Sequence, residues 1–152
     1  MPMVEGVRGT DADALSFGKA DYEALAAFRY ALRRFLRFSE DAARSHGITP
    51  QQHQLLLAIK GFPGRDWATV RELAERLKLR HHSVVGEIDR AASAGLVIRS
   101  PHADDRRVVE VRLTPAGERM LASLTAAHRQ ELQSMREELV ALGGLLATRS
   151  EP

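Results

Sequence analysis

The sequence contains no cysteine, which excludes disulfide frameworks, zinc sites built on thiolates and redox sensing by cysteine. No apolar run approaches the ~18 residues of a membrane span. The N-terminus also lacks the basic-then-apolar layout of a signal peptide. Together these absences predict a cytoplasmic protein that does not associate with a membrane.

Lysine is scarce, because 19 of the 22 basic residues are arginine. The 20 acidic residues nearly balance them and leave a net charge of +2. Arginine makes bidentate contacts with phosphates, bases and carboxylates, so a small net charge is compatible with a locally basic binding surface. With 44% hydrophobic residues in 152, the chain is expected to form one ordinary domain, with or without an attached oligomerisation element.

Apolar residues recur at steps of three and four in several segments, which is the spacing of amphipathic helices. The predicted helices cover residues 19–46, 50–60, 69–77, 83–94 and a C-terminal region from 115 onward. Two of them start at a capping box, in which Thr49 pairs with Gln52 and Thr69 pairs with Glu72. Residues 1–18 carry scattered charge without a sustained period, so we expect an N-terminal arm without assigned structure.

A charged hairpin follows the fourth predicted helix. Two short predicted strands, residues 96–98 and 108–113, flank the turn SPHADDRR, and the second strand alternates apolar with charged residues. A helix-turn-helix followed by such a hairpin is the layout of a winged helix, whose second helix enters the major groove of DNA while the wing reaches the backbone or minor groove. The alternative is a solvated turn with mixed charges. Its position directly after two short helices favours the wing.

An apolar stripe runs through the C-terminal helical region at close to the coiled-coil period. Because little of the chain remains to cover this stripe, we expect residues 19–47 and 115–148 to form a helical dimerisation region around a DNA-binding domain at residues 48–114. Gly143 and Gly144 should mark the fraying end of the last helix. The expected fold is mainly α with a small β-hairpin, a winged helix-turn-helix core flanked by long N- and C-terminal dimerisation helices.

Three segments carry a resemblance to a known family. They are TVRELAERLKL, SVVGEIDRAASAGLVIR and DDRRVVEVRLTPAGERML, in unbroken order between about Gly47 and Leu121. They resemble the MarR family, the multiple-antibiotic-resistance type of winged-helix transcriptional regulator. The resemblance covers half of the chain, and the flanking long helices fit the dimerisation elements of that family.

The resemblance implies which residues contact DNA. The wing motif falls on Asp105, Arg106 and Arg107, so Asp105 would orient Arg107 while Arg106 would add attraction for phosphate. The recognition helix would run from His82 to Ala94. Its expected DNA-contacting residues, with those that lead into it, are Arg80, His81, His82, Ser83, Val84, Gly86, Glu87 and Arg90. A phosphate would satisfy the positive end of the helix dipole near Arg80, although a solvated turn is the alternative.

Two positions depart from the pattern of the family. Gly86 and Glu87 stand where a polar residue and then an arginine are frequent. Glycine within a helix costs ~1 kcal/mol relative to alanine, so Gly86 is interpreted as permitting close approach to another backbone. Glu87 cannot hold a phosphate, and it either accepts a hydrogen bond from cytosine N4 or faces solvent.

The family resemblance also implies an effector, a small aromatic or anionic molecule bound between the dimerisation helices and the DNA-binding domain. Arg29, Arg33 and His53 are the candidates to line such a pocket. Arg29, Arg33 and Arg37 recur every four residues on one helix face, and such a stripe is most often solvated or paired with acids. Trp67 and Phe62 are interpreted as core residues rather than cofactor contacts.

No motif supports catalysis. His102, Asp104 and Asp105 lie on one short turn without a partner at ligand spacing, so a metal site there is disfavoured. There is no nucleophile elbow, glycine-rich phosphate loop or HExxH motif. We therefore expect neither an enzyme nor a bound cofactor or metal.

The sequence thus predicts a ligand-responsive, DNA-binding transcriptional regulator, most simply a repressor. It would bind a pseudo-palindromic operator in double-stranded DNA as a homodimer. The alternative is a winged-helix protein-interaction module without sequence-specific DNA binding, which the departures at Gly86 and Glu87 keep open.

Overall fold

The computed structural model describes residues 16–147, so most of the N-terminal arm expected at residues 1–18 lies outside the described residues. The chain divides into two compact units. Residues 34–134 form one unit, and the described residues up to Arg33 together with those from Met135 belong to the other.

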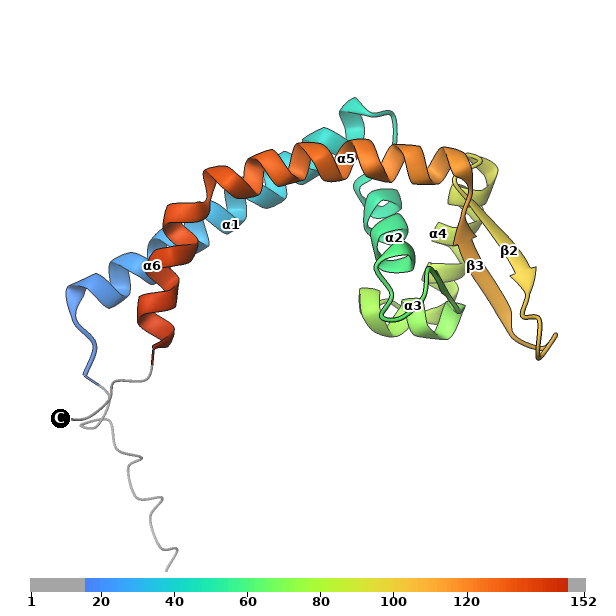
Figure 1. The fold of residues 1–152 in the computed structure, drawn as a ribbon, viewed down its shortest axis with the longest axis horizontal. Coiled ribbons are helices and arrows are strands. Elements are labelled where there is room, and N and C mark those ends of the chain that lie inside the picture. The colour runs from blue at the N-terminus through green and yellow to red at the C-terminus, as the bar shows by residue number, and fades with distance from the viewer. Residues whose placement is uncertain (1–15, 148–152) are drawn as a thin grey trace, which may run out of the picture. The chain divides into compact units, whose positions relative to one another are not determined.

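Three short helices form the centre of the larger unit (Figure 1). They are α2 (Pro50–Lys60), α3 (Val70–Leu77) and α4 (His81–Ser93). Both predicted capping boxes are present. Gln52 N–H donates to Thr49 Oγ1 (3.0 Å) and Glu72 N–H donates to Thr69 Oγ1 (3.3 Å), while each residue three positions on accepts from the threonine N–H. These caps satisfy backbone donors that the first helical turn leaves without partners.

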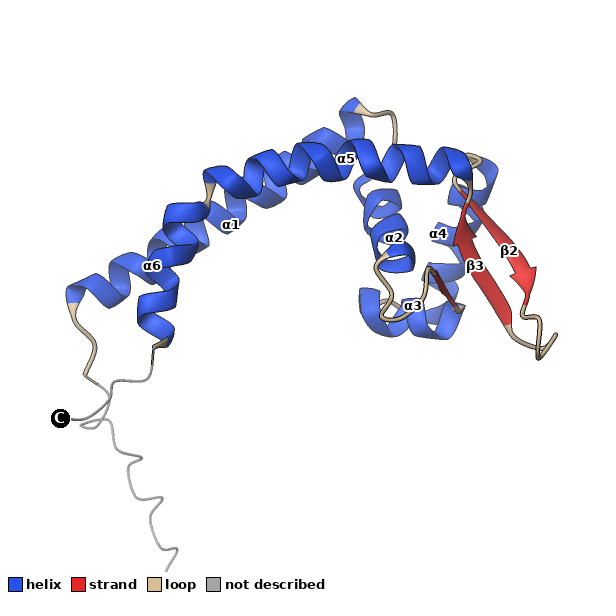
Figure 2. Cartoon of the chain, viewed as in Figure 1, coloured by secondary structure: helices blue, strands red, loops and turns tan. Residues whose placement is uncertain are grey.

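The sheet has three strands, not the two of the predicted hairpin. The strands β1 (Trp67–Ala68), β2 (Val97–Pro101) and β3 (Val109–Leu113) are antiparallel in the order β1-β3-β2. β1 pairs Trp67 with Arg112 and Ala68 with Val111. A strand of two residues is too short to show an alternating pattern, so no periodic signal predicted it. The β2–β3 hairpin extends past the helices as the wing (Figure 2).

The long helices match the predicted pattern with one interruption. Helix α1 (Lys19–Ser45) confirms the first predicted helix. The C-terminal region forms two helices, α5 (Pro115–Ser134) and α6 (Arg136–Leu146), separated at Met135. Gly143 and Gly144 lie in the last turn of α6, which ends at Leu146, close to the helix end that they were expected to mark. Glycine lowers helix propensity without forbidding a helix, and α6 continues for two further residues.

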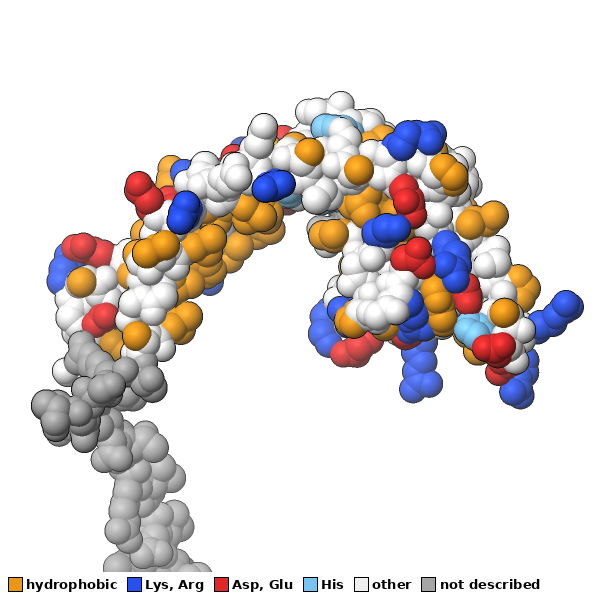
Figure 3. Space-filling view, in the orientation of Figure 1, with side chains coloured by type: hydrophobic (Ala, Val, Ile, Leu, Met, Phe, Trp, Pro, Cys, Tyr) orange, Lys and Arg blue, Asp and Glu red, His pale blue; other side chains and the backbone are white. Residues whose placement is uncertain are grey.

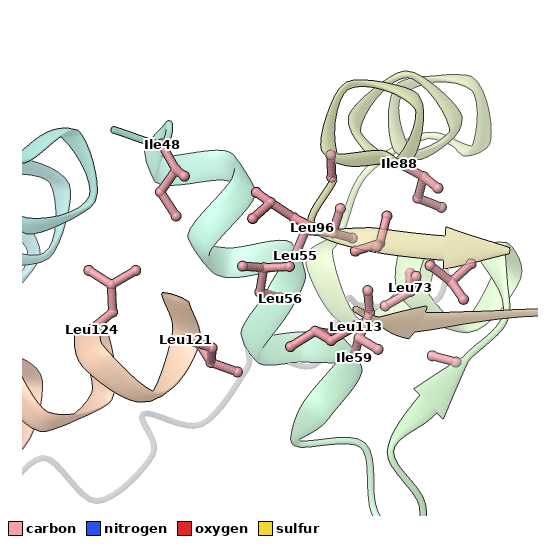
Figure 4. Packing of buried hydrophobic residues seen from close by; sticks show 14 of the residues in the cluster. Ile48, Leu55, Leu56, Ile59, Leu73, Ile88, Leu96, Leu113, Leu121 and Leu124 are labelled. Atoms are coloured by element: carbon pink, nitrogen blue, oxygen red, sulfur yellow. The ribbon is translucent and has the colours of Figure 1, made fainter. Parts of the chain in front are cut away.

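The hydrophobic core of the larger unit gathers around α2 (Figure 4). Leu55, Leu56 and Ile59 are fully buried, and they are covered by Leu73 of α3 and Ile88 of α4 among other residues of the cluster. Each fully buried leucine or isoleucine side chain contributes ~1.5–3 kcal/mol relative to an exposed one. The winged-helix domain therefore has its own core.

The first turn of α5 packs against the backbone just before β2, and Thr114 and Gly117 make this contact. Thr114 Oγ1 donates to the carbonyl of Gly95 (2.6 Å) and accepts from the N–H of Gly117 (3.0 Å). A Cβ on Gly117 would overlap the carbonyl oxygen of Leu96. Only glycine fits where the helix approaches this backbone so closely.

The smaller unit leaves many of its apolar side chains exposed. Tyr22 and Tyr30 on α1, and Val140 and Leu146 on α6, are all largely exposed. A cavity of about 320 Å³ in this unit is lined by Phe17, Asp21, Tyr22, Leu25 and Leu145. Within residues 16–147, no helix is both long and apolar enough to cross a membrane.

Candidate nucleic-acid interface

The turn between α3 and α4 is tight. Lys78 adopts a left-handed conformation (φ 53°), and Leu79 N–H donates to the carbonyl of Ala74 (3.0 Å). Arg80 is the N-cap of α4 and provides no side-chain cap. The helix begins at His81 and ends at Ser93, so it starts and ends one residue before the predicted recognition helix of His82 to Ala94.

The residues of α4 that were predicted to contact DNA differ in how far they are buried. Val84 is fully buried in the core, so it supports the helix and is not available to DNA, contrary to the prediction. The exposed members are Arg80, His81, His82 and Arg90, and Ser83, Gly86 and Glu87 are half-buried. On a helix with buried positions at Val84, Ile88 and Ala91, Gly86 lies on the opposite, outward face.

Glu87 has a partner that the sequence did not reveal. Its Oε1 accepts a hydrogen bond from Arg90 Nη2 at 2.8 Å, within one helical turn. A Cβ on Gly86 would lie 3.3 Å from Arg90 Nη1. The group that approaches Gly86 is therefore the guanidinium of its own helix, and not a second backbone from elsewhere in residues 16–147.

Asp89 points to a different arginine. Its carboxylate accepts from Arg99 Nη2 at 2.5 Å, which ties α4 to strand β2. Neighbouring residues on a helix face different directions, whereas residues three apart share a face. Arg90 consequently pairs with Glu87 and not with the adjacent Asp89.

The wing holds an arginine in the predicted way. Asp105 Oδ1 accepts from Nε of Arg107 at 3.1 Å and from its backbone N–H at 3.1 Å, and Oδ2 accepts from Nη2 at 3.3 Å. These hydrogen bonds from Arg107 lower the pKa of Asp105 below its usual value. The Arg107 side chain is 92% exposed, and basic side chains project from the wing in the space-filling view (Figure 3). Arg106 is exposed beside it.

A buried acid supports the base of the wing. The Glu110 side chain is almost fully buried, lies 3.6 Å from His102 Nε2, and accepts from Arg112 Nε at 2.9 Å. Arg112 also donates to Asp66 at 2.8 Å, next to β1. This network was not predicted, because alternation along β3 assigned Glu110 to the solvent face. The sequence carried no local signal for this contact, because Glu110 pairs with Ser100 in the sheet and reaches His102 diagonally.

Phe62 and Trp67 pack around an arginine instead of lying wholly in the core. The Arg65 guanidinium lies 4.2 Å from the Phe62 ring centroid and 3.8 Å from the Trp67 centroid, and it pairs with Glu72 of the α3 capping box. His102 approaches the same tryptophan with ring centroids 5.2 Å apart. This stack joins the start of α3 to the base of the wing.

A cleft of about 310 Å³ separates the start of α3 from the wing. Arg71 and Arg107 both line it, together with Thr69 and valines of the hairpin. Two cationic side chains at one cleft favour a polyanionic partner over a neutral one.

His53 lies in a cluster of histidines, not at an open surface. It is buried, its ring lies 4.7 Å from that of His128, and His128 bonds to Ser39 Oγ at 2.8 Å. Burial, and then the neighbouring His128 and His46, lower the pKa of His53 below its usual value of 6.5. Arg29 and Arg33 are exposed on α1. The effector pocket predicted from these three residues stays a prediction.

Within the described range 16–147, no group of three or more histidine or acidic residues is arranged to hold a metal ion. The side chain of His102 is instead engaged at the wing, where its Nδ1 accepts from the Asp104 N–H at 3.0 Å.

The three helices, the three-stranded sheet and the extended hairpin define a winged helix-turn-helix protein. Residues 46–108 of the chain match the model of the MarR family. This confirms the family resemblance on which the sequence-based site assignment was built.

Two repressors and one solved structure show the same relationship. The chain is 29% identical over 102 residues to the HTH-type transcriptional repressor MdtR of Bacillus subtilis, a match that spans 64% of each protein. It is 27% identical over 115 residues to the homoprotocatechuate degradative operon repressor of Escherichia coli, covering 66% of this chain and 76% of that one. A cysteine-to-serine mutant of E. coli MarR in complex with operator DNA is similar at 25% identity and a TM-score of 0.61, covering 78% and 87% of the two chains. The relatives are regulators, in agreement with the expectation of no enzymatic activity.

Proposed function

We propose that the protein is a homodimeric DNA-binding transcriptional repressor that responds to a small molecule. The observation that carries the proposal is the pair of exposed arginines, Arg90 on α4 and Arg107 on the wing, each held by a carboxylate of its own element. An arginine held in one orientation loses less conformational freedom when it makes a hydrogen bond to DNA.

The two arginines suit two different grooves. A helix such as α4 fits the major groove, and an arginine at the end of a narrow hairpin can enter the minor groove, where the potential is most negative. Arg80, His81 and His82 add exposed donors at the start of α4. Two such heads related by a twofold axis would read half-sites about 10 base pairs, or roughly 34 Å, apart.

The exposed apolar side chains of the smaller unit support homodimerisation. Tyr22, Tyr30, Val140 and Leu146 would be buried if residues 19–47 and 115–148 of two copies associated. Large apolar side chains gathered on the surface of a monomer usually mark an interaction site. The MdtR and homoprotocatechuate proteins are similar to this chain and are named as repressors, and we propose repression for this chain on the same basis. Because a repressor acts where its DNA lies, we also propose a cytoplasmic location.

The effector is proposed to be a small aromatic or anionic molecule, with Arg29, Arg33 and His53 as candidate contacts. A ligand regulates DNA binding only if it favours one arrangement of the two heads, typically by ~1–3 kcal/mol. Calorimetric titration of a candidate ligand with and without DNA measures that coupling, and equal affinities in both titrations would rule the ligand out.

DNA binding is tested by titrating the wild type and Arg107→Ala against a duplex from the chain's own promoter region. We expect Arg107→Ala to bind more weakly and to lower the slope of log K against log salt by ~0.9 for each phosphate that is no longer neutralised. Arg129→Ala is the matched control, because Arg129 is exposed on α5 and the substitution removes the same charge. Equal affinity and slope for the wild type and Arg107→Ala would exclude the wing from binding. Absence of any DNA binding, with a stable complex to another protein, would instead identify an interaction module.

A further inference from the structure

Helix α4 contains a cluster of three neighbouring residues that neither the family pattern nor the sequence predicted. Gly86, Glu87 and Arg90 form one cluster on α4, in which the glycine leaves space and the glutamate holds the arginine. We propose that Arg90 is a guanine-reading residue of α4, admitted to its position by Gly86 and oriented by Glu87. This inference rests on the proposed function of DNA binding.

The Arg90 side chain points toward the start of α4. Side chains of an α-helix lean back toward its N-terminus and cover the preceding turn. The Arg90 guanidinium accordingly lies over Gly86, with Nη1, Nη2 and Cζ at 3.3, 3.5 and 3.7 Å from the position of a Cβ there. A side chain at residue 86 would occupy this space. Glycine thus allows an arginine from the third turn to place its donors one turn nearer the helix start, the part that contacts base edges in helix-turn-helix proteins.

Most of the Arg90 donors stay available to a partner. Glu87 Oε1 takes a hydrogen bond from Arg90 Nη2, and the Glu87 side chain is only 17% exposed, so its carboxylate is fixed beside the helix. Arginine has five N–H donors in a planar fork, and one of them is used here. The Arg90 side chain is 63% exposed, which leaves donors able to bond guanine O6 and N7 together.

The charge of the Glu87–Arg90 pair favours a base over a phosphate as the partner. An arginine that attracts phosphate gains from its uncompensated charge, whereas Glu87 cancels the charge of Arg90 at 2.8 Å. The N–H donors of Arg90 keep a fixed direction, and a fixed direction is what recognition of a base requires. The other nearby acid, Asp89, is bound to Arg99 and does not compete for Arg90.

The experiment selects binding sites from a pool of random-sequence duplexes with the full-length protein. The wild type should enrich a motif with guanine at one position of each half-site, favoured about tenfold over other bases, within the ~1–3 kcal/mol of a bidentate contact. Arg90→Lys keeps the charge and loses the fork, so it should reduce this preference to less than about twofold. Arg119→Lys, at an exposed position of α5, is the matched control and should select the wild-type motif.

Two further variants test the positioning roles of Gly86 and Glu87. Glu87→Gln and Gly86→Ala should each weaken the guanine preference while the rest of the motif stays unchanged. Because alanine favours a helix more than glycine does, Gly86→Ala should unfold at an equal or higher temperature, which separates altered reading from misfolding. A double variant is informative as well, since Glu87→Gln in an Arg90→Lys background should have no further effect on the preference.

The outcomes separate the role of Arg90 from the DNA binding on which it rests. If the wild type selects a motif and Arg90→Lys selects the same one, Arg90 does not read a base and the inference is overturned while DNA binding stands. A shallower salt dependence with an unchanged motif in Arg90→Ala would assign Arg90 to a phosphate and would also overturn it. If the wild type enriches no sequence at all, the proposed function fails and the inference fails with it.

Discussion

The two compact units of the chain differ in how far their large apolar side chains are buried. The large side chains that are fully buried, Leu55 and Leu73 among them, belong to residues 34–134. In the other unit, Val140 is 69% exposed and Leu146 is 73% exposed. Single exposed apolar residues also occur in the larger unit, where they are ordinary for a protein surface.

This difference in burial suggests that one unit accounts for folding of the monomer and the other for association of two copies. The winged-helix unit has a hydrophobic core of its own, so we expect its stability to depend little on protein concentration. The smaller unit exposes apolar side chains that a second copy could bury, so its contribution to stability should depend on protein concentration. Substitutions in each unit, and a change of pH, test that separation from the largest expected effect to the smallest.

Leu55→Ala should destabilise the protein by about 2–5 kcal/mol, because it leaves a cavity in the core of the winged helix. Leu146→Ala is the matched control at an exposed position and should cost far less in the monomer. Urea denaturation at two protein concentrations measures both. A loss for Leu55→Ala that disappears at high concentration would contradict a self-sufficient core.

Gly117→Ala should cost about 1–3 kcal/mol, since the new Cβ would overlap the carbonyl oxygen of Leu96 and the backbone has to move. The same substitution at Gly144, where a Cβ would meet no atom of the described residues within 4 Å, should instead stabilise α6 by ~1 kcal/mol. Thermal unfolding of the two variants gives shifts of opposite sign if the close approach at Gly117 is real.

Val140→Lys should raise the dissociation constant of the dimer by at least about tenfold, which corresponds to ~1.4 kcal/mol, because a lysine would enter an apolar interface without a partner. Gln54→Lys makes the same change of charge at an exposed position of α2, outside the proposed dimerisation region. Sedimentation velocity across a dilution series distinguishes them. A wild type that is already monomeric at micromolar concentration would remove the basis for the dimer.

The smallest effect concerns pH and His53, whose pKa is lowered in the folded state. Below about pH 6.5 the unfolded chain then binds more protons at this residue than the folded chain does, so stability falls as the pH drops. One group changes stability by at most ~1.4 kcal/mol per pH unit. Thermal unfolding between pH 8 and pH 5 should show a smaller decline for His53→Gln than for the wild type, and parallel declines would exclude His53 as the cause.

The helices were predicted well from the sequence because their ends carry local chemistry. Thr49 and Thr69 bond to side chains and backbone only three residues away, and such contacts are legible in a single sequence. The break at Met135 and the strand at Trp67 were missed, because neither has a proline, a glycine or an alternating pattern to mark it. The pairing of β1 with β3 is a tertiary contact that local patterns do not encode.

The candidate site was predicted in part for the same reason. Asp105 and Arg107 are two residues apart on a turn, so their contact could be expected from the sequence. The role of Glu87 could not, because it depends on the direction of the Arg90 side chain and on the space above Gly86. Burial likewise removed Val84 from the predicted contacts, since the same helix face that carries the apolar repeat cannot also meet a partner.

One hydroxyl has a mechanical consequence for regulation. Thr114 Oγ1 links Gly95, just before β2, to the first turn of α5, and Gly117 leaves no gap between that turn and the Leu96 backbone. The start of α5 and the start of the hairpin are therefore joined by hydrogen bonds and close packing. We therefore expect that a tilt of α5 would also change the angle at which the hairpin leaves the domain.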